Sequence, residues 1–208
     1  ITWDERGFGG TVATGPFTYW DSANDVIALL DHLKIEKAVI GGMSQGGFLS
    51  LRVALTAPSR VRALILLDTQ AGTEDPATVE PYNQLHAAWV EHGAIAVQDV
   101  VASLILGPGE WTEWFNKWGA MVPDQFTKAF ECLMHRDDIT SRLGEISCPS
   151  LIVHGTADAS IPMEKAEVLR DGLGGVTSLV AIEGGPHAAN MTHSDPVNKA
   201  ILQFLSTL

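Results

Sequence analysis

Short apolar runs alternate with amphipathic stretches along most of the chain. Within residues 21–33, Val26, Leu29, Leu30 and Leu33 recur at the 3.6-residue spacing of a helix that buries one face. Similar patterns predict helices at 45–57, at 163–173 and from Asp195 onward. Apolar runs typical of buried strands occupy residues 37–41, 62–68, 150–154 and 177–182. This alternation predicts an α/β fold, with a mostly parallel sheet and flanking helices.

The interval between Asp68 and Ser150 carries helical patterns but few strand signals. It is too long for a simple loop, so we expect a helical cap at residues 71–145, inserted after the strand that ends at Asp68. The α/β core then comprises residues 1–70 and 146–208. Aromatic residues recur at helical spacing inside the cap, at Trp111, Trp114, Phe115 and Trp118. They either pack against neighbouring helices or form the wall of a substrate pocket.

Four glycines surround one serine in the stretch GGMSQGG, residues 41–47. The stretch contains the pattern G-x-S-x-G and lies between a predicted strand and a predicted helix, which is the context that this motif requires. Glycine there allows a tight, strained turn that lifts the hydroxyl of Ser44 into a cleft. The N–H of Gln45, at the helix N-terminus, then faces the oxyanion that forms when Ser44 attacks a carbonyl.

A serine hydroxyl is a weak nucleophile at neutral pH, so it needs a base and a group that orients the base. In the order serine, acid, histidine, Asp158 and His187 follow the predicted strands at 150–154 and 177–182, at the edge where open α/β sheets bind ligands. Asp68 also ends a strand and is the alternative acid, and His193 is the alternative base. We interpret His154 as a structural residue at a strand end.

These motifs resemble those of the α/β-hydrolase family, of the lid-bearing serine esterase type. WDERGFG at residues 3–9 resembles the family's D-x-R-G-x-G loop, HGTAD at 154–158 its acid loop, and GGPH at 184–187 its histidine loop. The resemblance covers nearly the whole chain. It implies that Ser44 is the nucleophile, His187 the base and Asp158 the acid, with the helical insertion as a lid.

The resemblance also implies the chemistry. Ester hydrolysis through an acyl-enzyme is expected, without a metal or organic cofactor. The aromatic-rich cap suggests that the substrates are small apolar or aryl esters. Lactone, C–C bond and perhydrolysis chemistries stay open, whereas serine at the turn argues against the dehalogenases and epoxide hydrolases, which use aspartate. We expect four residues to contact the substrate: Met43, Trp111, Trp114 and Trp118.

The chain departs from the family pattern at its start. Three strands and a helix that precede the D-x-R-G-x-G loop in the family have no counterpart here, and the loop after the third strand supplies the second oxyanion donor. Buried backbone groups left without a partner cost about 1 to 3 kcal/mol each. We therefore expect an N-terminal segment or a second copy of the chain, as in a homodimer, to complete the sheet.

Composition narrows the possible partners. A formal net charge of −12 disfavours nucleic acids and anionic membrane surfaces as partners. The two cysteines, Cys132 and Cys148, have no metal-ligand spacing. Two cysteines alone do not make a disulfide framework, so a reducing, cytoplasmic location is expected. The alternative to an enzyme is a non-catalytic protein of the same fold, or an inactive fragment, that binds a ligand through the cap cleft. The missing oxyanion loop favours that alternative, and a complete set of serine, acid and histidine disfavours it.

Overall fold

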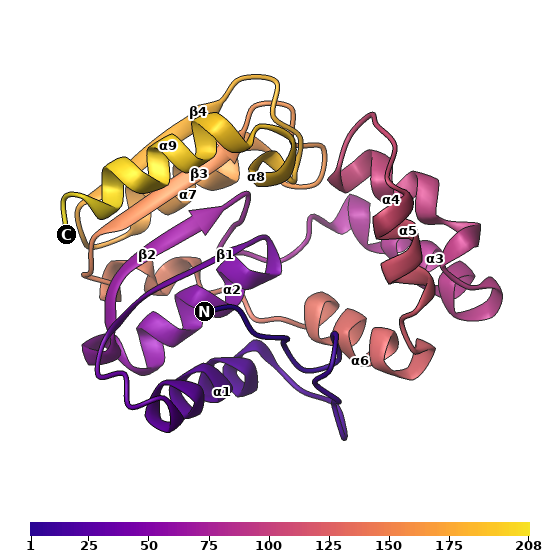
Figure 1. The fold of residues 1–208 in the computed structure, drawn as a ribbon, viewed down its shortest axis with the longest axis horizontal. Coiled ribbons are helices and arrows are strands. Elements are labelled where there is room, and N and C mark those ends of the chain that lie inside the picture. The colour runs from indigo at the N-terminus through magenta and orange to yellow at the C-terminus, as the bar shows by residue number, and fades with distance from the viewer.

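The computed structural model describes all residues, 1–208, and contains a four-stranded parallel sheet. Its strands lie side by side in the order β1-β2-β3-β4 (Figure 1). Each run predicted to be a strand forms one, so the α/β prediction is confirmed. The strands span Ala38–Met43 (β1), Val61–Leu67 (β2), Ser150–Gly155 (β3) and Thr177–Ile182 (β4).

Helices cover both faces of the sheet. The larger apolar core lies between one face, which includes Leu64 and Ile152, and the helices α1, α2 and α7. The other face, which includes Leu151 and Val153, packs against α9. These helices span Tyr19–His32 (α1), Gln45–Thr56 (α2), Met163–Gly172 (α7) and Ser194–Leu205 (α9), close to their predicted bounds, and the single turn α8 spans Ala189–Thr192.

The long insertion between β2 and β3 contains helices and no strand. Its four α-helices form a group beside the sheet, which we call the helical layer (Figure 1). They span Pro76–His92 (α3), Gln98–Ile105 (α4), Thr112–Gly119 (α5) and Pro123–Met134 (α6). Short 3₁₀ turns occur at Pro58–Arg60, Ala94–Ala96 and Thr140–Glu145. The insertion returns to the core at β3.

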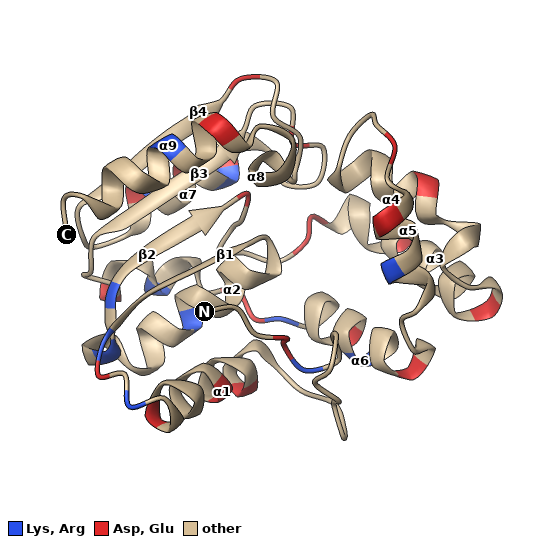
Figure 2. Cartoon of the chain, in the orientation of Figure 1, with Lys and Arg blue, Asp and Glu red and all other residues tan.

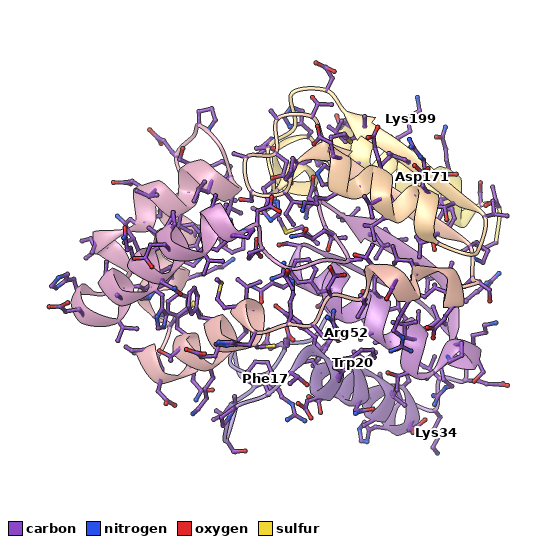
Figure 3. The ribbon with its side chains drawn as sticks, turned by 180° about the vertical axis from the view of Figure 1, so that it is seen from behind. Phe17, Trp20, Lys34, Arg52, Asp171 and Lys199 are labelled. Carbon is purple, nitrogen blue, oxygen red and sulfur yellow. The ribbon has the colours of Figure 1, made fainter.

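A buried arginine ties the return segment of the insertion to α1 and α2. Arg52 on α2 lies beside the indole of Trp20 on α1, with its guanidinium 5.4 Å from a Trp20 ring centroid (Figure 3). Its Nη2 donates to a carboxylate oxygen of Asp137 at 2.7 Å. Because the Arg52 side chain is only 1% exposed, this pairing satisfies a charge that would be costly to leave buried alone.

The strand that precedes the serine lies at an open edge of the sheet. β1 pairs with β2 on one side and with no strand on the other. Residues 1–18 contain no helix or strand, although residues 1–5 run near β1. A groove of about 410 Å³ follows this edge, and most of the residues that line it are apolar, including Val39, Leu29 and Trp3.

Lysine and arginine residues occur on the core and on the helical layer, and several lie near the start of β1 and β2 (Figure 2). Acidic residues occur on the core helices and on the helical layer alike. None of the helices combines the length and the apolar character needed to cross a bilayer.

Candidate active site

Ser44 occupies a strained turn between β1 and α2. Its φ of +51° lies in the left-handed region that residues with a side chain rarely adopt. A Cβ at Gly42 would lie 2.4 Å from the backbone of Gly46, and one at Gly47 would lie 2.4 Å from Oγ1 of Thr69. The turn therefore needs glycine at both positions, which accounts for the glycine-rich stretch. Oγ1 of Thr69 donates to the carbonyl oxygen of Ser44 at 2.7 Å and fixes the turn.

The start of α2 offers free hydrogen-bond donors beside Ser44. The carbonyl oxygen of Ser44 accepts the N–H groups of Gly47 and Phe48, at 2.8 and 3.2 Å. The N–H groups of Gln45 and Gly46 have no backbone acceptor, as is usual in the first turn of a helix. Together with the positive end of the helix dipole, these groups favour negative charge beside the serine.

His187 and Asp158 form a buried pair on the loops that follow β4 and β3. Nδ1 of His187 lies 2.7 Å from Oδ2 of Asp158. The other carboxylate oxygen, Oδ1, accepts the N–H groups of Ser160 and Ile161 at 2.8 and 2.9 Å. The Asp158 side chain has no exposed surface and that of His187 is 5% exposed. Three donors thus hold the carboxylate in place behind the imidazole.

Asp68 and His193, the alternative acid and base, have other hydrogen-bond partners than the His187–Asp158 pair. Asp68 is 1% exposed, and its Oδ1 accepts the N–H of Gly155 at 2.7 Å. Burial is the main cause that raises the pKa of Asp68 to about 8, and the charge of Asp158 adds to it. His154 is fully buried, with Nε2 2.7 Å from the carbonyl oxygen of Ile161, and burial lowers its pKa. His193 contacts Oγ1 of Thr192 at 2.9 Å.

Ligand atoms of Asp68, His154 and Asp158 lie within 4.8 Å of one another, the spacing that a metal ion requires. Both oxygens of Asp158 are already engaged, by His187 on one side and by two backbone N–H groups on the other. The cluster therefore fits a hydrogen-bonded network better than a cation site.

Ser44, Gln45 and His187 line one cavity of about 190 Å³ between the sheet and the helical layer. Ser44 and His187 are not hydrogen-bonded to each other. Aromatic side chains of α3 and α6 form much of the wall, with Trp89 stacked on Phe126 at 4.2 Å and His86 stacked on Phe130 at 4.2 Å. The remaining lining residues include Phe48, Glu74, Tyr82, Leu85, Val101, Leu104, Ile105, Leu133, Ser160 and Ile161.

The four residues expected to contact the substrate lie outside this cavity. Met43, Trp111 and Trp114 pack around Ala102, Leu106 and Ala188, and Trp118 packs near Trp89. The aromatic residues that do line the cavity were missed, although Phe126 and Phe130 follow the same i, i+4 spacing. Helical spacing marks a shared face, but it does not show whether that face meets a cavity or another helix.

Comparisons with known proteins agree with this architecture. The family model of the alpha/beta hydrolase fold matches residues 1–131, and a model described as TAP-like protein matches residues 133–208. The chain belongs to the α/β-hydrolase fold family. The "Putative carbamate hydrolase RutD" of Variovorax paradoxus is 28% identical over 229 residues, covering 99% of this chain and 80% of that protein.

Solved α/β-hydrolase structures superpose on nearly the whole chain. A thermophilic esterase from Thermogutta terrifontis has a TM-score of 0.84 at 27% identity and covers 98% of this chain and 78% of its own. The enol-lactonase from Burkholderia xenovorans has a TM-score of 0.86 at 23% identity, which shows the shared fold, over 98% of this chain and 79% of its own. These similarities support a hydrolase.

Proposed function

We propose that this α/β-hydrolase is a serine esterase that cleaves small apolar or aryl carboxylic esters through an acyl-enzyme. One observation carries the proposal: the strained Ser44 lines the same mostly apolar cavity as His187, which pairs with the buried Asp158. Ser44, Asp158 and His187 follow one another along the chain in the order nucleophile, acid and base that the family shows. The 27% identity with the Thermogutta terrifontis esterase adds support.

In the proposed reaction, Oγ of Ser44 attacks the ester carbonyl carbon while Nε2 of His187 takes the hydroxyl proton. Asp158 fixes the tautomer through Nδ1 and stabilises the imidazolium that forms. The N–H of Gln45 and the N-terminus of α2 stabilise the oxyanion. His187 then protonates the leaving alcohol. Water, activated by the same imidazole, releases the acid and restores Ser44.

The cavity indicates the size of substrate. Its volume of about 190 Å³ slightly exceeds that of an engineered apolar cavity of roughly 150 Å³ that binds benzene. Aromatic and aliphatic side chains dominate the wall, so an acyl or aryl group of similar size fits without leaving polar groups unpaired. We further propose that the helical layer acts as a cap that excludes water from this cavity.

Hydrolysis of p-nitrophenyl acetate and butyrate, together with covalent labelling by a fluorophosphonate, tests the esterase. The expected result is turnover and labelling that both disappear in Ser44→Ala. A folded wild-type chain that neither turns over the esters nor labels at Ser44 would favour the alternative, a protein that binds a ligand without catalysis. Mass spectrometry of the labelled peptide identifies the modified residue.

Carbamate cleavage is the second candidate, because the similarity to the Variovorax paradoxus protein covers 99% of this chain. Ser44 would attack a carbamate carbonyl by the same steps. Comparing kcat/KM for p-nitrophenyl butyrate and a matched p-nitrophenyl N-alkylcarbamate separates the two. We expect the ester to be preferred, and a higher kcat/KM for the carbamate would reverse the assignment.

A further inference from the structure

A second buried carboxyl group lies directly behind the His187–Asp158 pair, and the proposed mechanism gives it no role. Asp68 follows β2, and its backbone has a φ of +46°, in the same unusual region as Ser44. Its N–H donates to the carbonyl oxygen of Val153, and its Oδ1 accepts the N–H of Gly155 at 2.7 Å. Asp68 therefore forms two hydrogen bonds with the end of β3, just before the loop that carries Asp158.

We propose that Asp68 is a positioning residue for the triad: its neutral carboxyl group fixes the loop that carries Asp158 and leaves Asp158 as the single negative charge behind His187. The inference rests on the proposed serine hydrolase function. It concerns how the acid loop is held, and it assigns Asp68 no contact with the substrate.

The arrangement of charges supports a neutral Asp68. Ligand atoms of Asp68 and Asp158 lie within 4.8 Å, and both side chains are almost fully buried. Two buried carboxylates at that separation repel each other strongly, so one of them stays protonated. The hydrogen-bond donors around the two groups decide which of them keeps the proton.

The donors around the two groups differ. Asp158 faces His187 and two backbone N–H groups, whereas Asp68 has the N–H of Gly155, with the N–H of Ala189 also facing it. His154 is the remaining titratable group at the cluster, and burial keeps it neutral by lowering its pKa. No lysine or arginine forms an ion pair with Asp68. The negative charge therefore belongs on Asp158, in agreement with the raised pKa of Asp68, about 8.

Two variants separate positioning from simple packing. Asp68→Ala removes the acceptor for Gly155, and we expect kcat to fall by about 10- to 100-fold with little change in KM, because small misplacements of a catalytic group carry such costs. Asp68→Asn keeps a neutral group with an acceptor oxygen, and we expect it to recover most of the lost rate. Glu183→Gln, on an exposed residue after β4, is the matched control.

The pH profile of kcat/KM gives a readout that packing alone would not move. In the wild type, ionisation of Asp68 near pH 8 places a second charge beside Asp158, and we expect the rate to fall there. In Asp68→Asn that fall should be absent, while the midpoint of the acid limb stays where it is in the wild type. A shift of the acid limb by a pH unit or more in Asp68→Asn would show that Asp68 is already ionised, and would overturn the proposal.

A direct measurement keeps this test separate from the test of the esterase. Carboxyl ¹³C chemical shifts of Asp68, followed against pH in Ser44→Ala, report its protonation whether or not the protein turns over esters. Titration near pH 8 supports the inference, and titration near pH 4 contradicts it. Full kcat in a folded Asp68→Ala would contradict the positioning role. Failure of the wild type to label at Ser44 would instead overturn the esterase and leave the titration result standing.

Discussion

The two edge strands of the sheet have different surroundings. β4 begins with the polar residues Thr177 and Ser178, and Ser178 and Ala181 are exposed, as suits a strand that ends a sheet. β1 is apolar throughout and borders a groove of about 410 Å³ with mostly apolar walls. Such an apolar composition is typical of a parallel strand that is covered on both faces. β4 therefore exposes polar and small residues at its edge, whereas β1 leaves apolar residues beside an open groove.

A polar group beside β1 points the same way. Glu5 lies in the groove along β1, and its Oε1 is buried without a hydrogen-bond partner. Burial raises the pKa of Glu5 to about 7, with a smaller contribution from Asp25. Asp158, at the other side of the sheet, has every oxygen engaged. We propose that an extended segment, from a second copy of the chain or from an N-terminal segment, pairs with the free side of β1.

Each edge strand leads to one residue of the proposed triad, Ser44 after β1 and His187 after β4. Replacing either residue should cause the largest predicted loss of activity. Ser44→Ala and His187→Ala should each lower kcat by about 10⁶-fold, and the double variant should lose no more, because the two residues act as a unit. The steady-state kcat of each purified variant with p-nitrophenyl butyrate measures this loss. Additive losses would show that the two edges act independently.

Pairing of a further segment with β1 should have the next largest effect on activity. The oxyanion has one assigned backbone donor, Gln45, and one missing donor elsewhere costs about 10²- to 10³-fold in rate. If a second copy of the chain covers β1 and supplies a donor, specific activity should rise by up to about 10²- to 10³-fold as the chain associates between nanomolar and micromolar concentrations. Sizing and hydrogen exchange should report association and slower exchange in β1 with β4 unchanged. A monomer of constant activity, with fast exchange in β1, would contradict pairing at this edge.

The sequence revealed more about the core than about the cavity. Strand and helix positions follow from local spacing, and the Ser44 turn follows from glycines that a Cβ at Gly42 or Gly47 would disrupt. The wall formed by Trp89 and Phe126 depends on how α3 and α6 pack, which local spacing does not contain. The pairing of His187 with Asp158 rather than Asp68 likewise depends on loops that meet only in three dimensions.

A smaller effect concerns stability at the open edge. The pKa of Glu5 is about 7 in the folded chain, above its ordinary value of 4.5, so the folded state holds an extra proton between these pH values. Stability should therefore fall as pH rises through that window, by about 2 kcal/mol after allowance for partial exposure. Urea unfolding at pH 5 and pH 8 measures the loss of stability, which Glu5→Gln should reduce by about 2 kcal/mol and Glu183→Gln should leave intact. The part that remains in Glu5→Gln is assigned to Asp68, whose pKa is also raised. An equal loss in Glu5→Gln would assign it to other groups.

The smallest effect compares single side chains on the two edges. Ser178→Val on β4 should change the free energy of unfolding by less than about 0.5 kcal/mol, as exposed positions usually do. Val39→Ser on β1 puts a hydroxyl into the apolar groove and should cost about 1 kcal/mol or more, because part of that surface is already removed from water. The difference between the two free-energy costs should increase as the chain associates, because pairing at β1 would bury Val39 further. If both substitutions cost the same free energy of unfolding at every protein concentration, pairing of a further strand with β1 would be contradicted.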